Sequence, residues 1–117
     1  MDSESDLNCC QLCAKKLCCR YSVCLTQNEY DMLSGFGDGL GAGGLCGAVI
    51  GAIAGACLIA GGVEAEKIRL SVIMEFMDTF STVSCSKLSD YYSNGCERVI
   101  ATAVAAAENA LKVTGLP

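Results

Sequence analysis

The feature that most constrains the fold of this chain is an uncharged, glycine-rich stretch over residues 39–63. Its 25 residues include nine glycines, of which Gly47, Gly51 and Gly55 recur at every fourth position. On an α-helix this spacing forms a smooth stripe that lets a second helix approach closely. We therefore expect a helix over residues 45–60 at the centre of the fold.

A membrane-spanning helix is the alternative interpretation of this stretch, because 25 uncharged residues are long enough to cross a bilayer. The high glycine content, the loop-like first third and the lack of flanking Lys/Arg clusters or Trp/Tyr belts oppose it. A helix that is apolar on all sides is also typical of the centre of a soluble bundle. The sequence favours the bundle, and a small membrane subunit stays the less favoured alternative.

Four further helices are expected, and no segment has the pattern of a strand. The first covers residues 5–21 with Ser3, Ser5 or Asp6 as its cap, and the second opens at the capping-box pair Thr26 and Glu29. The last runs from a cap at Asn94 to about Lys112 with an inner face of Cys96, Val99, Ile100, Ala103 and Ala107.

The helix expected over residues 64–80 is amphipathic. Its core face is predicted from the helical spacing of Leu70, Ile73, Phe76, Met77 and Phe80. Together these segments predict an all-α fold, a compact bundle of about five helices around the Gly/Ala-rich one, as a single domain over residues 1–117.

Ten cysteines and no histidine restrict the chemistry of the chain. The absence of histidine excludes Ser-His and Cys-His nucleophile systems, His-ligated haem and mixed Cys/His zinc sites. The net charge is −5 and the basic residues are scattered, so nucleic acid is not expected as a partner.

The acidic start, Met1-Asp2-Ser3-Glu4-Ser5-Asp6, does not have the charged and apolar pattern of a secretory signal. We therefore expect a cytoplasmic protein whose thiols are kept reduced. A disulfide scaffold is the alternative, and the supply of aliphatic residues for a core argues against it.

Four cysteines are expected at or near the starts of helices: Cys9, Cys46, Cys85 and Cys96. Unpaired N–H groups and the positive end of the helix dipole stabilise a thiolate at such a position, and the thiolate is the form that binds metal or attacks a substrate. If the four helix starts meet, they present four thiolates to one site.

A second constellation lies near the amino terminus and comprises Cys10, Cys13, Cys18, Cys19 and Cys24. Cys10 and Cys13 form a CxxC motif and share a helix face with Cys9, whereas Cys18 and Cys19 turn away from that face. No histidine follows the motif, which excludes c-type haem attachment. A second metal site or a reversible dithiol pair is possible here, and Cys57 is expected in the core.

The chain resembles the C_GCAxxG_C_C family of redox-active proteins. The resemblance is carried by Asn8-Cys9, by Ser34-Gly35-Phe36-Gly37 with its glycine-rich continuation, by the CGAxxG motif at Cys46–Gly51, and by Phe80, Cys85, Leu88 and Cys96. It covers nearly the whole chain and implies an all-helical, intracellular, redox-active domain. By motif position it assigns Cys9, with Cys10 as the alternative, together with Cys46, Cys85 and Cys96 as the characteristic cysteines.

The leading hypothesis is an iron–sulfur protein that transfers electrons to or from a redox partner protein, with Cys9, Cys46, Cys85 and Cys96 as metal ligands and one or two clusters as cofactor. Backbone N–H groups of the glycine-rich loop, including Gly43, Gly44 and Gly47, would contact the cofactor. A metal-free thiol–disulfide enzyme and a structural zinc protein are the alternatives, so the sequence leaves open whether the chain is an enzyme. The glycine stripe also makes a homodimer possible.

Overall fold

The computed structural model describes residues 7–37, 44–84 and 97–114. These residues form five α-helices and two short 3-10 turns: α1 (Cys9–Arg20), α2 (Gln27–Leu33), η2 (Ser34–Phe36), α3 (Gly47–Ala60), η4 (Gly62–Glu64), α4 (Ala65–Phe80) and α6 (Glu97–Val113). In this described part of the chain the only extended pairing is an isolated antiparallel bridge between Leu45 and Ser84. The predicted all-α class is confirmed.

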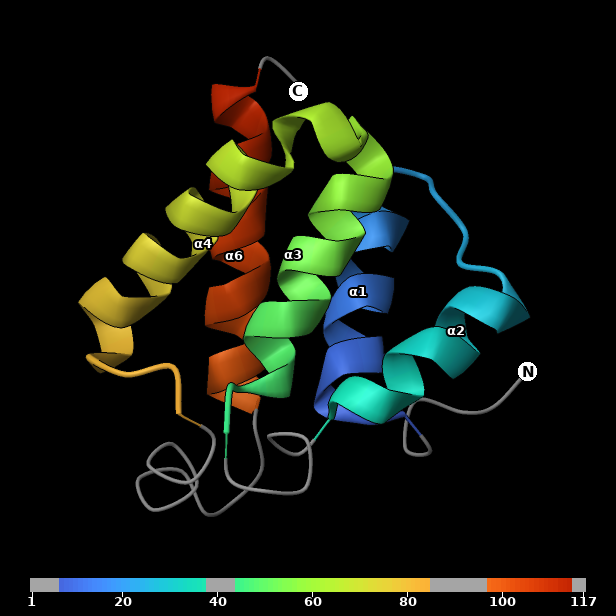
Figure 1. Ribbon diagram of the computed structural model, residues 1–117, viewed down its shortest axis with the longest axis horizontal. Helices are drawn as coiled ribbons and strands as arrows, with labels where there is room; N and C mark the ends of the chain where they lie inside the picture. The colour runs from blue at the N-terminus through green and yellow to red at the C-terminus, as the bar shows by residue number, and fades with distance from the viewer. Residues whose placement is uncertain (1–6, 38–43, 85–96, 115–117) are drawn as a thin grey trace.

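Helix α3 lies at the centre of the bundle and contacts α1, α4 and α6 (Figure 1). Helices α1, α3 and α6 all begin at the lower end of the molecule in Figure 1, and α4 ends there. Helix α2 lies at the edge, against α1. The starts of three helices, where the backbone N–H groups have no partner within the helix, therefore share one end of the fold.

The main core is formed by one face each of α3, α4 and α6, together with part of α1. Small residues of α3 (Ala48, Ala52 and Ala56) lie fully buried against larger side chains from the neighbouring helices. The largest of these neighbours is Phe76 of α4, which stacks in a tilted arrangement on Phe80 with 4.9 Å between ring centroids. Small residues on the central helix and large ones around it allow the helices to pack closely.

The glycine stripe of α3 packs directly against the backbone of α1, as the sequence predicts. A Cβ atom placed on Gly51 would lie 2.1 Å from the carbonyl oxygen of Cys10, and one on Gly55 would lie 3.3 Å from Cα of Ala14. At Gly47 it would lie 3.0 Å from the carbonyl oxygen of Phe36. The first distance leaves no room for any side chain, so glycine at position 51 is a requirement of the fold.

The start of α1 differs from the prediction. Asn8 caps the helix: its side chain accepts a hydrogen bond from the backbone N–H of Gln11, and the Gln11 side chain accepts one from the N–H of Asn8. The expected start at residue 5, with Ser3, Ser5 or Asp6 as cap, is wrong because this reciprocal capping box satisfies the first N–H groups at Asn8. The equivalent box of Thr26 and Glu29 at the start of α2 is confirmed.

The predicted core face of α4 is also partly wrong. The buried residues are Ile68, Val72 and Phe76, whereas Leu70 and Met77 are 52% and 43% exposed. The helix carries apolar residues over more than half of its circumference, so the sequence pattern alone did not identify which part faces α3 and α6. The inner face of α6 is confirmed at Val99, Ile100, Ala103 and Ala107, and Cys96 lies outside the described residues.

The length and apolarity needed to cross a membrane are not reached by any helix in residues 7–37, 44–84 and 97–114. Helix α3 itself has 14 residues, fewer than the about 20 needed to span a bilayer.

Replacing Gly51 with alanine tests the close approach of α1 and α3. The new methyl group would overlap the Cys10 carbonyl, and overpacking of this kind costs about 3 kcal/mol. The better helix propensity of alanine returns about 1 kcal/mol. We expect urea denaturation to show a net loss of about 2 kcal/mol in the free energy of unfolding.

The matched control is Gly62→Ala, because a Cβ at Gly62 meets no atom within 4 Å. Its free energy of unfolding should stay within about 0.5 kcal/mol of the wild-type value. Equal stability of Gly51→Ala and Gly62→Ala would contradict the observed helix packing.

Candidate thiol site

Two of the four cysteines predicted as ligands lie at helix starts at the same end of the bundle. Cys9 is the first residue of α1 and is half-buried, and Cys46 is the N-cap of α3 with 5% exposure. Cys85 and Cys96 lie outside the described residues. Helix α3 begins at Gly47 rather than at Leu45, so Cys46 occupies the cap position just before the first turn.

The described residues next to Cys85 and Cys96 lie at the same end of the bundle as Cys9 and Cys46. The backbone N–H of Cys46 donates to the carbonyl of Val83 over 2.7 Å, and Leu45 bridges to Ser84, the residue before Cys85. Helix α6 begins at Glu97, the residue after Cys96, and its start lies at the same end as those of α1 and α3 (Figure 1).

Cys13 joins this region from one turn further along α1. Its thiol is fully buried and donates a weak hydrogen bond to the Ile100 carbonyl of α6 over 3.7 Å. Cys13 and Cys46 belong to the same core cluster, and Cys9 packs against it. The i, i+4 spacing of Cys9 and Cys13 thus places both on the side of α1 that meets this cluster.

Cys10 faces a different neighbourhood, a small cluster with Ala14 and Leu33. Burial raises the pKa of the Cys10 thiol to about 12, and the nearby Cys46 adds to the effect. Burial likewise raises the pKa of Cys13, with further contributions from Cys46, Cys9 and Cys10. Both thiols are therefore protonated at neutral pH, which makes them poor nucleophiles.

A network of side-chain hydrogen bonds fixes the start of α1. The side-chain amide of Asn8 donates to the carbonyl of Ser34 over 3.0 Å, and that of the buried Gln11 donates to the carbonyl of Tyr30 over 2.8 Å. These bonds attach the first turn of α1, including Cys9 and Cys10, to α2 and η2. The network positions the candidate ligand Cys9, and sequence analysis missed it, although the Asn-x-x-Gln pattern of a capping box was present.

The structure separates the remaining amino-terminal cysteines from this region. The Cys18 thiol is fully buried against α3, where it lies 3.9 Å from the Gly55 carbonyl, whereas Cys19 and Cys24 are exposed. Cys18 does turn away from the face of Cys9 and Cys13, but α3 covers it. In residues 7–37, 44–84 and 97–114 no three Cys, Asp or Glu side chains form a group with the geometry of a metal site. The second site of Cys10, Cys13, Cys18, Cys19 and Cys24 stays a prediction.

The three glycines predicted to contact a cofactor have different surroundings. Gly43 lies outside the described residues, and Gly44 is exposed just before Leu45. Gly47 is buried, and its missing side chain allows the backbone of Phe36 and Gly37 to approach. The observed role of Gly47 is therefore in packing, and its contact with a cofactor stays a prediction.

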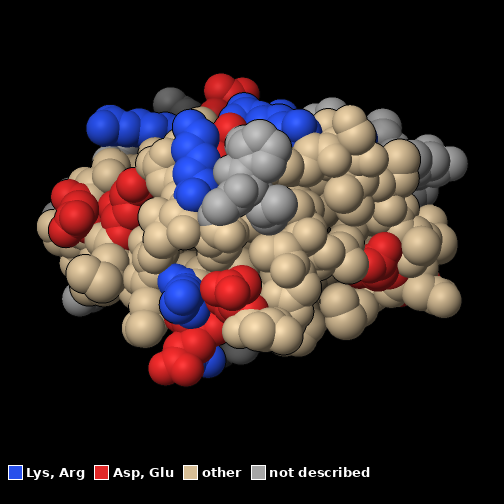
Figure 2. Space-filling model, turned by 90° about the horizontal axis from the view of Figure 1, so that it is seen from above, with Lys and Arg blue, Asp and Glu red and all other residues tan. Residues whose placement is uncertain are grey.

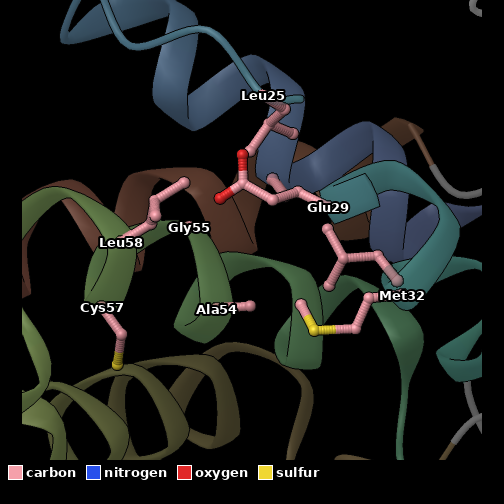
Figure 3. Close-up of a pocket in the computed structure, with 9 residues that line it drawn as sticks. Leu25, Glu29, Met32, Ala54, Gly55, Cys57 and Leu58 are labelled. Carbon is pink, nitrogen blue, oxygen red and sulfur yellow. The ribbon is translucent and has the colours of Figure 1, made fainter. Parts of the chain in front are cut away.

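Cys57 is half-buried against the main core, as predicted. Desolvation raises its pKa, and Arg69 of α4 opposes that shift. Figure 3 shows its sulfur directed away from Leu25 and Glu29, which line a largely apolar cleft between α2 and α3. One oxygen of the Glu29 carboxylate accepts the capping hydrogen bond from the backbone N–H of Thr26.

The charges on the outside of the bundle are mixed. On the face shown in Figure 2, acidic and basic side chains lie close together over part of the surface, and uncharged side chains cover a broad area beside them. Arg20 and Glu108 form an ion pair that connects the end of α1 to α6.

Comparison with models of protein families gives a match over most of the chain. A family model described as "Putative redox-active protein (C_GCAxxG_C_C)" matches residues 7–110. Neither the curated proteins nor the solved structures contain a match to the chain. The matched range includes Cys9, Cys46, Cys85 and Cys96 and covers every described helix except the last residues of α6.

The buried Cys18 predicts a loss of stability at alkaline pH. Burial, followed by the nearby Glu29 and Cys19, raises its pKa from 9.0 to about 11. Between these values the unfolded chain releases the Cys18 proton while the folded chain retains it, so the free energy of unfolding falls as pH rises from about 9 to about 11. Below pH 9 Cys18 contributes no pH dependence.

Urea denaturation of reduced, metal-stripped protein across this pH range measures the effect. Cys18→Ala should make the fall with pH shallower, and the matched control Cys24→Ala, at an exposed cysteine, should follow the wild-type slope. Parallel pH profiles for all three proteins would show that Cys18 is not a protonated, desolvated thiol in the folded state.

Proposed function

Because the chain belongs to the C_GCAxxG_C_C family of redox-active proteins, we propose that it binds an iron–sulfur cluster through Cys9, Cys46, Cys85 and Cys96 and acts in electron transfer. The donor chemistry supports this proposal, since a chain with ten cysteines and no histidine offers thiolates as its soft ligands.

The observation that carries the proposal is the shared position of three helix starts. Cys9 and Cys46 occupy the starts of α1 and α3. Ser84, which precedes Cys85, bridges to Leu45 at this end, and Glu97, which follows Cys96, begins α6 there. Ligands from separate segments that meet at one end of a bundle can bind a small cluster, because no long loop is needed to bring them together.

The protein supplies charge stabilisation and a dry environment on the bundle side of this site. The first turn of α3 has no side-chain cap, so the positive end of its dipole is available to stabilise negative charge at Cys46. Val49 and Ile100, both in the core cluster with Cys46, exclude water from that side. An iron–sulfur cluster supplies one-electron transfer, and burial and nearby hydrogen bonds tune its potential.

A metal-free thiol–disulfide enzyme is the second candidate, because Cys13 and Cys46 lie in one core cluster, Cys9 packs against it and Cys10 adjoins Cys9 in α1. Such an enzyme needs a low-pKa nucleophile, and burial has the opposite effect on two of these thiols. The cluster proposal is therefore preferred. It includes a cytoplasmic location, where thiols are kept reduced, and a redox partner protein that exchanges the electron.

Anaerobic purification from iron-replete cells tests the proposal. We expect protein with broad charge-transfer absorption in the visible region and with bound iron and acid-labile sulfide. Colourless protein that contains zinc would contradict the proposal and indicate a structural zinc site. Metal-free protein with a reversible two-electron thiol titration would replace it with the thiol–disulfide enzyme.

Single substitutions test the assigned ligands. Cys9→Ser, Cys46→Ser, Cys85→Ser and Cys96→Ser should each lose most of the iron and sulfide or shift the visible spectrum, because serine does not replace a soft thiolate equally. The matched control is Cys57→Ser, a half-buried cysteine further along α3, which should keep both metal content and spectrum. Loss in the control with retention in Cys46→Ser would contradict the assignment.

A further inference from the structure

Helix α4 has an exposed apolar stripe that the bundle does not use. Leu70, Met74 and Met77 are 52%, 67% and 43% exposed, although their spacing places them on one side of the helix. This side of α4 lies roughly opposite Ile68, Val72 and Phe76, the residues that the bundle buries. Exposed apolar side chains that are contiguous, rather than scattered, indicate an interaction surface.

A groove runs beside this stripe, between α4 and α6. Its lining is apolar at Met74, Ala106 and Val113 and polar at Glu75, Asp78 and Asn109. Val113 is itself 74% exposed. The hydrogen bond from the Asn109 side chain to the Glu75 carboxylate (2.9 Å) holds the two helices together across the groove. An exposed apolar stripe can pack against the same stripe of a second copy, because a two-fold interface brings the same surface of both subunits together.

The charges along α4 indicate how the helices of two copies would be oriented relative to each other. Lys67, Ser71, Met74 and Asp78 follow one another at i, i+4, i+7 and i+11, so they form one row along the helix. The row begins with a cation and ends with an anion. When two such rows lie antiparallel, Lys67 of each chain meets Asp78 of the other, and a parallel arrangement brings like charges together.

Lys67 and Asp78 are available for such a contact. The Lys67 side chain is 75% exposed, and its contact with Glu64 is a surface pair at 3.9 Å, an interaction that contributes little. Asp78 is exposed as well. Ion pairs of this kind act mainly on the orientation of the partners, while the apolar stripe supplies the attraction.

We propose that this surface of α4, with the adjoining edge of α6, binds a second copy of the chain in an antiparallel two-fold dimer. The pairing centres near Ile73, brings Leu70 of each copy within one helical turn of Met77 of the other, and forms two Lys67–Asp78 ion pairs. An anionic membrane surface fits less well, because Glu66, Glu75 and Asp78 accompany the apolar residues and the chain has a net charge of −5.

The expected dimer is of moderate strength. A helix of 16 residues is about 24 Å long, and one such face with the edge of its neighbour is smaller than the surface of a tight complex. We therefore expect a dissociation constant on the order of micromolar. Sedimentation velocity on full-length reduced protein, from about 1 to about 500 μM, should show a monomer–dimer equilibrium. A monomer throughout this range would overturn the proposal.

Substitutions identify the surface. Met74→Asp should weaken dimerisation at least tenfold, with an unchanged circular dichroism spectrum because Met74 is exposed. The matched control is Met32→Asp, since Met32 of α2 is a methionine of similar exposure (59%) outside this surface. Weakening by Met32→Asp but not by Met74→Asp would overturn the proposal.

Carbodiimide coupling tests the antiparallel arrangement. In one chain Lys67 and Asp78 are separated by about 16 Å along α4, too far for a zero-length bond. In an equal mixture of ¹⁵N-labelled and unlabelled protein, we expect Lys67–Asp78 cross-linked peptides that contain one labelled and one unlabelled half. Charge reversal by Lys67→Asp or Asp78→Lys should weaken the dimer several-fold, and the double variant should restore it. A dimer without the mixed peptide, or a double variant weaker than both single ones, would contradict this pairing.

Discussion

The contact between the backbones of α1 and α3 at Gly51 is the constraint on which the rest of the structure depends. With no space for a Cβ at Gly51, the Cys10 carbonyl lies directly on α3. This contact fixes the position of α1 along the axis of α3, so that Cys9 and Cys46 lie at the same end of the bundle. The hydrogen bond from the Cys13 thiol to the Ile100 carbonyl then connects α6 to α1. A packing requirement thus also determines where the thiols gather.

The number and class of the helices could be predicted because their signals are local. Glycine spacing identifies the central helix, and Thr26 with Glu29 marks the start of α2. The start of α1 was placed too early because several residues before Asn8 are equally good caps in isolation. Asn8 is distinguished from them by the reciprocal capping box with Gln11, and its side chain makes a further bond to the Ser34 carbonyl, in a segment far away in the sequence.

The orientation of α4 shows a second limit of local patterns. When apolar residues cover most of a helix, periodicity does not distinguish the face that meets the core from a face that meets another molecule. The residues predicted for the core included Phe76, which is fully buried, and Leu70, which is about half exposed. The difference between them arises from the positions of α3 and α6, and it leaves the outer stripe free for the proposed dimer.

For the cysteines, too, the sequence predicts the local features and the packing of the helices determines the rest. Their placement at helix starts was predicted for Cys9 and Cys46 from sequence, because a helix start is a local feature. The burial of Cys13 and Cys18 was not, because it depends on α6 and α3 respectively.

The central claim is that cysteine sulfurs from separate helix starts hold iron at one end of the bundle. Iron K-edge X-ray absorption of anaerobically purified protein tests it most directly, because the spectrum reports which atoms surround the metal. If cysteine sulfurs hold an iron–sulfur cluster, the spectrum shows sulfur as the nearest neighbours of the iron and a second iron beyond them. A first shell of oxygen or nitrogen, with no neighbouring iron, would contradict it.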